Sequence, residues 1–175
     1  MLLTDYTYYQ GDSAITAMYQ GDVKVYPLEP PVTNNKIYYT STDGNIVDVL
    51  SMSFDANIIS NTYGSEGGVI IFDRTVTSIG NNAFDYCETL SSVMIPDSIT
   101  SIGNGAFNKC SSLSGITIPD SVTSIGEFVF SECLALSNIT YTGTMAQWTQ
   151  ITKGTNWNQN VPATVVHCSD GDVPI

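Results

Sequence analysis

Cations are scarce in this sequence of 175 residues. It contains 5 Lys and Arg against 17 Asp and Glu, which gives a formal net charge of -12 at pH 7. So few isolated cations cannot form a basic patch, and nucleic acids and anionic membrane surfaces are therefore excluded as partners. Charged residues make up only 13% of the chain, but 42% of the residues are hydrophobic. That fraction is enough for a core and argues against global disorder.

Long apolar runs are also missing. No stretch reaches the 18 or more apolar residues of a membrane span, so membrane insertion is not expected. The segment Met1–Tyr6 lacks the basic start and the apolar run of a secretory signal. The sequence therefore predicts no uncleaved signal peptide.

Histidine occurs once, at His167. This removes Ser–His catalysis and multi-histidine metal sites from the chain unless His167 itself serves. His167 precedes Cys168, which pairs the residue types of a base and a nucleophile. Adjacent residues on a strand point to opposite faces, however, so we expect no dyad. The sequence predicts no catalytic residues, no metal site and no cofactor, and hence no enzyme.

A repeat of 23 residues dominates the middle of the chain. Cys87, Cys110 and Cys133 follow this spacing, as do the Phe, Leu, Ile and Gly positions around them. When Ser92–Ser114 is aligned with Gly115–Ser137, 12 of the 23 positions are identical. A fixed period of this length predicts a solenoid, whose coils bury their apolar faces only by stacking.

One coil can be read from its own residues. Residues 93–95 alternate between apolar and exposed positions, as a short strand with one buried face does, and Pro96 ends that strand. Residues 99–103 predict a second short strand, which ends at a Gly expected to have a positive φ. Ala106, Phe107 and Cys110 have the spacing of one helical turn. Each coil is therefore predicted as strand, turn, strand and helical turn.

The motif at residues 116–126, Ile-Thr-Ile-Pro-Asp-Ser-Val-Thr-Ser-Ile-Gly, followed by Phe130 and Cys133, resembles the BspA-like leucine-rich-repeat family of the 23-residue type. The resemblance covers residues 69–137, although Asp73 replaces the strand-ending Pro in the first coil. It implies a mostly β fold with short helical turns, a leucine-rich-repeat solenoid of three full coils. It also implies adhesion or recognition without catalysis, since members are typically surface-exposed or secreted proteins of host-associated microbes.

The flanking segments predict caps and an appendage. We divide the chain into a Tyr-rich hairpin appendage at 1–31, an N-terminal cap at 32–68, the solenoid at 69–137, and a fourth strand with a C-terminal cap at 138–175. Asp43-Gly44 is a strong hairpin signal within the first cap. Trp148 and Trp157 are expected to cover the last Phe of the repeat. The appendage is too short to bury a core of its own, so it must pack on another surface.

Two groups of repeated polar residues could carry chemistry, and each also has a structural explanation. The three repeat cysteines lack the close spacing of zinc ligands, so we expect buried free thiols. Asp97 and Asp120 recur at strand ends, where a row of carboxylates could bind a cation weakly. The simpler interpretation is that each is a turn residue bonded to its own backbone.

The outward face of the strands is the expected interaction surface. Its predicted residues are Ile71, Met94, Thr117 and Thr140, flanked by Ser92 and Asn138. Four strands give a face of roughly 250 Å², whereas a standard interface takes about 800 Å² per partner. Many weak contacts in an array would therefore be more effective than one tight complex.

Two functions remain open at this point. The first is a non-enzymatic recognition or adhesion module that contacts a protein or a glycan. The second is a structural component of a phage virion or another particle, such as a fibre or decoration protein. In the second case the N-terminal segment would mediate homo-oligomer or particle assembly through the tyrosines Tyr6, Tyr8, Tyr9, Tyr19 and Tyr26. The compartment is then either the cell surface or extracellular space, or a virion.

Overall fold

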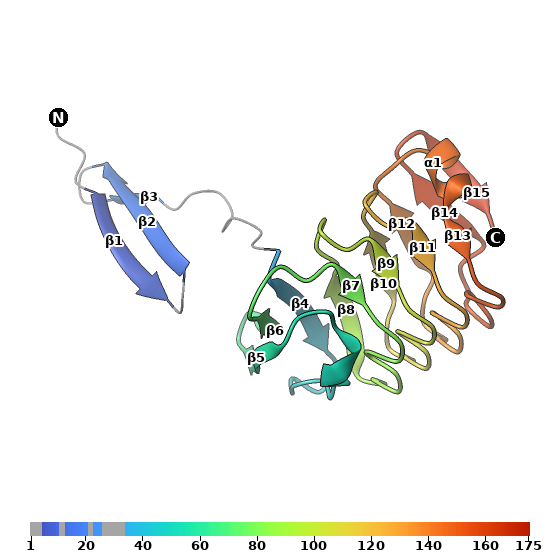
Figure 1. Ribbon diagram of the computed structural model, residues 1–175, viewed down its shortest axis with the longest axis horizontal. Coiled ribbons are helices and arrows are strands. Elements are labelled where there is room, and N and C mark those ends of the chain that lie inside the picture. The colour runs from blue at the N-terminus through green and yellow to red at the C-terminus, as the bar shows by residue number, and fades with distance from the viewer. Residues whose placement is uncertain (1–4, 11–12, 21–22, 26–33) are drawn as a thin grey trace. The chain divides into compact units, whose positions relative to one another are not determined.

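The chain divides into two units, Met1–Thr33 and Asn34–Ile175. The computed structural model describes the backbone of residues 5–10, 13–20 and 23–25, and all of residues 34–175 (Figure 1). In the first unit, β1 (Asp5–Gln10), β2 (Ser13–Gln20) and β3 (Val23–Val25) form an antiparallel sheet in the order β1-β2-β3. The expected hairpin is thus a three-stranded meander.

The second unit is a solenoid with two sheets. Its larger sheet has eight strands in the order β15 (Gly171–Pro174), β14 (Val165–Cys168), β12 (Asn138–Tyr141), β10 (Gly115–Ile118), β8 (Leu90–Met94), β4 (Lys36–Ser41), β6 (Gly67–Phe72) and β5 (Ile58–Gly64). The smaller sheet has the order β13 (Thr152–Lys153), β11 (Ser124–Ile125), β9 (Ser101–Ile102) and β7 (Ser78–Ile79). Each coil contributes one strand to each sheet, and the solenoid makes about four turns (Figure 1).

The repeat ladders form the core as expected. Phe84, Phe107 and Phe130 are fully buried, and their rings stack at 5.0 and 5.7 Å between centroids. Phe54 extends the stack from the N-terminal side, and Trp157 extends it on the other side with its ring 6.1 Å from Phe130. The aromatic spine therefore runs through both caps, which closes the two ends of the solenoid core.

The glycines that end the short strands have a different cause from the expected one. Gly80, Gly103 and Gly126 do not have positive φ values. A Cβ at Gly103 would instead lie 2.6 Å from the backbone nitrogen of Asn81, in the preceding coil. Close approach between neighbouring coils, not turn conformation, therefore requires glycine here.

The helical turn of each coil is a run of hydrogen-bonded turns. The amide of Cys110 donates to the carbonyl of Phe107 at 3.2 Å, one turn back along the chain. Residues with left-handed φ then recur every 23 residues at Tyr86, Lys109 and Glu132, with φ near 60°. They stop any helix after one turn and redirect the chain into the next strand.

The N-terminal cap departs from the expected topology. Asp43-Gly44 does turn, with Gly44 at φ 70°, but no strand follows it. The hairpin is formed by β5 and β6, joined at Ser65-Glu66. Strand β4 lies between β6 and β8 and is antiparallel to both. Residues 69–72 are therefore part of the cap hairpin and not the first parallel strand of the repeat.

The C-terminal segment keeps the path of the solenoid for one further, longer coil. Strand β13 pairs in parallel with β11, and β14 pairs in parallel with β12. Between β12 and β13 the coil contains helix α1 (Met145–Gln150), which Thr144 caps through a reciprocal bond pair with Gln147. The antiparallel strand β15 ends the sheet. The 3-10 turn at Ser51–Ser53 is the other short helical element of the solenoid unit.

Candidate interaction surface

One row of side chains crosses the exposed face of the eight-stranded sheet. Strand register places these residues side by side, one from each strand, and we call them the outward row: Thr62, Val69, Tyr38, Met94, Thr117, Thr140, His167 and Asp172. Their strand neighbours alternate into the core, because successive strand residues point to opposite faces. Met94 is 58% exposed in the middle of the row.

A depression of about 580 Å³ lies where the N-terminal cap meets the first coil. Its exposed lining is an apolar centre with hydroxyls and two carboxylates around it, formed by Tyr38, Met94, Thr40, Ser92, Thr117, Glu66 and Asp97. The hydroxyl of Thr40 bonds Ser92 at 2.6 Å and Ser91 at 2.8 Å, which fixes one wall. The combination suits a ligand with both an apolar face and hydrogen-bonding groups.

The structure brings together most of the expected surface residues. Met94, Thr117 and Thr140 are neighbours in the outward row, and Ser92 and Asn138 lie in the next row of the same sheet face. The expected position of Ile71 next to Met94 is wrong. Strand β4 separates their strands, and Ile71 pairs with Lys36 instead. The sequence repeat could not show this, because β4 lies outside it.

Tyr38, Thr40 and Glu66 are the residues that sequence reasoning missed. They come from the cap, and only the antiparallel insertion of β4 places them beside the repeat strands. The alternation in residues 36–41 indicates a strand with one buried face. It does not indicate which strand becomes its neighbour.

His167 and Cys168 do not face each other. His167 is exposed on β14 and its Nδ1 bonds the carboxylate of Asp172 at 2.8 Å. Cys168 is half-buried, and its thiol lies 3.9 Å from the carbonyl of Val166. Burial raises the pKa of this thiol, and the carboxylates of Asp170 and Asp172 raise it further. A thiol that is held protonated and turned away from the imidazole is a poor nucleophile.

The repeat cysteines are free and buried, as predicted. Each thiol donates to a carbonyl of the preceding coil or cap, at 3.2 Å for Cys87, 3.1 Å for Cys110 and 3.0 Å for Cys133. Burial, together with the nearby carboxylates of Asp48 and Asp85, raises the pKa of Cys87 to about 12. Hydrogen bonding with Cys133, together with burial, also raises the pKa of Cys110. These thiols fill the core and link adjacent coils.

Metal-binding clusters are not found in the part of the chain that the structure describes: no three His, Cys, Asp or Glu side chains converge there. Asp97 and Asp120 are both exposed at strand ends, and the amide of Asp120 donates to Thr142 at 2.8 Å. The described helices include none long and apolar enough to span a membrane.

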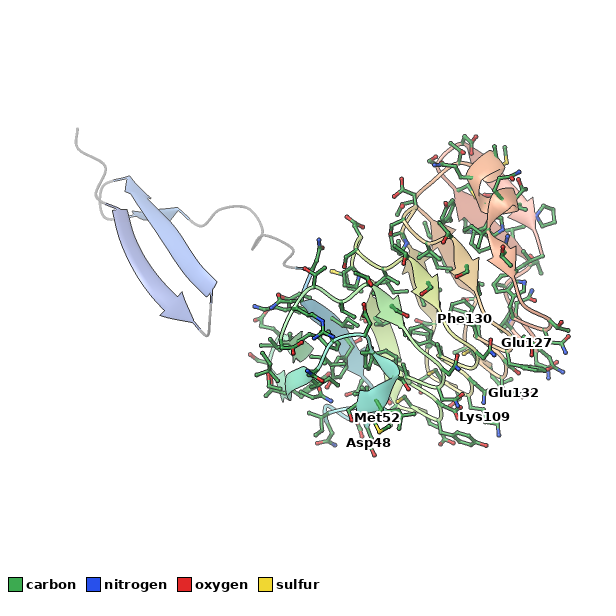
Figure 2. All side chains as sticks on the ribbon, viewed as in Figure 1. Asp48, Met52, Lys109, Glu127, Phe130 and Glu132 are labelled. Carbon is green, nitrogen blue, oxygen red and sulfur yellow. The ribbon has the colours of Figure 1, made fainter. Side chains whose placement is uncertain are left out.

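The turn edge of the solenoid carries a second set of exposed side chains (Figure 2). Here the left-handed residues of successive coils interact. The ammonium of Lys109 hydrogen-bonds the Tyr86 hydroxyl and lies 4.1 Å from its ring centroid, and Asn160 donates to Glu132 at 2.5 Å. Each of these side chains thus has a partner in the next coil, so the edge links coils together.

The tyrosines proposed for assembly lie in the first unit. Tyr6, Tyr8 and Tyr9 are on β1 and Tyr19 is on β2, while Tyr26 lies outside the described residues.

One family model matches the repeat region of the chain. The model described as "BspA type Leucine rich repeat region (6 copies)" matches residues 63–157, more than half of the chain. The chain belongs to the BspA-type leucine-rich-repeat family. No curated protein matches this leucine-rich-repeat chain.

Solved leucine-rich-repeat structures show local likeness. A leucine rich cell surface protein from Faecalibacterium prausnitzii A2-165 is 44% identical over 45% of this chain, with a TM-score of 0.44, and the match covers 21% of that protein. This chain therefore spans about a fifth of the F. prausnitzii protein. A leucine-rich repeat protein from Bacteroides capillosus is 25% identical over 78% of this chain and 95% of its own, with a TM-score of 0.47.

Proposed function

We propose that this protein is a non-enzymatic recognition module that contacts a protein or a glycan through the outward row. The observation that carries the proposal is the depression around Tyr38 and Met94, which combines an exposed apolar centre with hydroxyls and carboxylates. Membership of a repeat family of binding scaffolds supports the same function. A rigid sheet face that presents such groups in fixed register is suited to recognition.

The test is a binding assay with a matched pair of variants. The wild-type protein is screened against immobilised extracellular proteins and oligosaccharides, and each positive probe is then tested with Thr117→Arg and Thr149→Arg. Thr117 lies in the outward row beside Met94, whereas Thr149 is exposed on α1. Thr117→Arg is expected to weaken binding at least about tenfold, because a long cation would cover the depression, while Thr149→Arg binds like wild type. Equal binding by both variants would contradict the proposal.

A second candidate is a structural role in a phage virion or another particle, with assembly through the N-terminal unit. The observation that favours it is the separation of residues 1–33, with their own three-stranded sheet, from the solenoid. A unit as short as Met1–Thr33 can bury only a small core of its own, so it gains from docking on another surface. The two candidates are compatible, since a particle could display a recognition solenoid.

A further inference from the structure

The solenoid unit has few cations, and most of them are engaged within the fold. Residues 34–175 contain 13 Asp and Glu against four Lys and Arg. Arg74, Lys109 and Lys153 each bond a partner inside this unit. The fourth, Lys36, forms no ion pair among the described residues and does not line the depression on the sheet face. The unit therefore presents an excess of carboxylates that its own cations do not neutralise.

Two of these carboxylates, Glu66 and Asp97, stand at opposite ends of the depression. Strands β6 and β8 both run antiparallel to β4, one on each side of it. Glu66 precedes the start of β6 and Asp97 follows the end of β8, so the two residues lie at opposite ends of β4. Both are exposed, neither belongs to an ion pair of the described residues, and the described lining of the depression includes no Lys or Arg. The apolar centre thus lies between two unpaired carboxylates.

The turn edge shows how the same groups hold a cation elsewhere in this fold (Figure 2). There the ammonium of Lys109 lies 4.1 Å from the ring centroid of Tyr86. Hydrogen bonding with the Tyr86 hydroxyl raises the pKa of Lys109, and neighbouring carboxylates, among them that of Asp85, raise it further. A tyrosine ring with carboxylates beside it therefore favours a cation. On the sheet face Tyr38 has the two depression carboxylates beside it, but no cation lies over its ring among the described residues.

We propose that the depression binds a basic segment of a protein partner, with a lysine or arginine side chain lying over Tyr38 and Met94. This proposal rests on the recognition function proposed above and names its ligand class. The aliphatic stem of such a side chain packs on apolar groups while its charged head reaches a carboxylate. Because the carboxylates stand at opposite ends, a segment with two basic residues can pair with both, whereas a single small cation cannot. The hydroxyls of Thr40 and Ser92 lie between them and can bond the backbone of the segment.

Charge complementarity favours a basic segment over other ligands. The excess of carboxylates in residues 34–175 attracts a basic partner from a distance and repels acidic glycans. A neutral glycan could use the hydroxyls of the depression but would gain nothing from the charge of Glu66 and Asp97. The two kinds of ligand differ in one measurable property. Salt screens the attraction between exposed charges, so binding of a basic segment must weaken as the ionic strength rises, and binding of a neutral sugar need not.

The test uses a short fluorescein-labelled peptide of alternating Lys and Thr, and the same peptide with Glu in place of Lys. Fluorescence anisotropy of the full-length wild type is expected to show binding of the lysine peptide, weakened by salt, and none of the glutamate peptide. The double variant Glu66→Gln with Asp97→Asn is expected to bind at least about tenfold more weakly, because two charge-assisted contacts are lost. The matched control is Glu88→Gln with Glu127→Gln, which removes the same charge from exposed residues outside the depression and should bind like wild type.

A second pair of variants separates the aromatic ring from the charges. Tyr38→Phe keeps the ring face and should bind like wild type, whereas Tyr38→Leu keeps an apolar group without a ring and should bind about threefold more weakly. Urea midpoints close to that of wild type show that these variants are folded. Equal binding by Tyr38→Phe and Tyr38→Leu would overturn the placement of the cation over the ring.

Equal weakening by the two double charge variants would overturn the proposal, because net charge alone would then explain binding. Failure of the lysine peptide to bind wild type would overturn it as well. Binding of a neutral oligosaccharide that Thr117→Arg weakens and Thr149→Arg does not would keep the recognition function and show that its ligand is a glycan. The ligand class can therefore fail while the recognition surface stands.

Discussion

Single residues in this solenoid are constrained mainly by the coil next to them. Gly103 illustrates this, because the atoms that exclude a side chain there are Asn81 and Gly80 of the preceding coil. The same contact recurs at Gly126, against Asn104, and at Gly154, against Glu127. The short distance between coils therefore requires the repeated glycine, and its replacement should weaken the packing of neighbouring coils.

Gly103→Ala is expected to destabilise the protein by about 1–3 kcal/mol, the usual cost of overpacking. Its Cβ would meet backbone atoms at 2.6 Å, which cannot move without displacing a coil. Gly115→Ala is the matched control: its Cβ would lie 3.6 Å from the nearest atom, and its φ is not left-handed. Urea unfolding measures both. Equal midpoints for the two variants would contradict the close-approach explanation.

The burial of the repeat cysteines leads to a prediction about their reactivity with thiol reagents. Cys87, Cys110 and Cys133 should resist a thiol reagent in the folded state, because they are buried and the pKa values of Cys87 and Cys110 are raised. Cys168 is half-buried and should react first, which provides an internal control. Mass spectrometry of the labelled protein gives the order. Rapid labelling of all four before unfolding would show that the cysteine ladder is not packed as the structure has it.

At the scale of elements, the aromatic spine and the cap contacts hold coils that have little regular structure of their own. The strands of the smaller sheet are only two residues long, and side-chain stacking adds to the backbone hydrogen bonds that join neighbouring coils. Phe107 is in the middle of this stack, with aromatic neighbours on both sides.

Phe107→Ala should cost roughly 3–5 kcal/mol, because it leaves a cavity between two coils that cannot collapse. Phe84→Ala and Phe130→Ala should destabilise the protein less than Phe107→Ala if the adjoining caps relax around the cavity. Leu134→Ala is the control, since Leu134 is 59% exposed. Chemical denaturation compares the midpoints. An unchanged midpoint for Phe107→Ala would be incompatible with its place in the core.

Asp55 gives the N-terminal cap a pH dependence. Burial raises the pKa of this carboxyl, but hydrogen bonds from Thr77 and Ser78 outweigh that effect and lower it below its usual value. Because the folded-state pKa is the lower one, the stabilisation is complete above about pH 4 and is lost as the pH falls through the folded-state pKa.

Asp55→Ala should therefore lower the thermal midpoint at pH 7, and the difference from wild type should shrink steadily below about pH 4. Thermal unfolding from pH 7 to pH 2 measures this. Asp120→Ala is the control, because Asp120 is exposed and follows β10, away from the N-terminal cap. A difference that stays constant over the whole pH range would rule out the carboxylate as its source.

At the scale of the whole molecule, the chain combines a short N-terminal unit with a solenoid that carries its own cap. The ring of Phe54 packs against both Phe72 and Phe84, so the cap in residues 34–72 already covers the first coil. We therefore expect the solenoid to fold without a second cap.

Deletion of residues 1–31 should accordingly leave the main melting transition nearly unchanged. Any association with a particle or larger assembly is expected to be lost. Calorimetry and sedimentation of the truncated protein check the two parts. A loss of several kcal/mol, or aggregation, would mean that the segment is part of the solenoid cap and would remove the main support for the assembly function.

The sequence by itself determined the solenoid. Positions such as Phe107 and Cys110 recur at 23 residues, and stacked identical coils have to place equal positions next to each other. The period also explains the buried thiols, and Trp157 covers the end of the aromatic ladder as expected. What lies outside the repeat was predicted less well: Asp43-Gly44 forms a turn without the expected hairpin.

Only the tertiary structure decided the surroundings of Met94 and the cause of the repeated glycines. The insertion of β4 between β6 and β8 moves Ile71 away and places Tyr38 beside Met94. Alternation in a strand shows which face is buried, but a strand outside the repeat carries no period that names its neighbour. Likewise, Gly103 is required by atoms of another coil. Contacts between segments distant in sequence are visible only after the chain has folded.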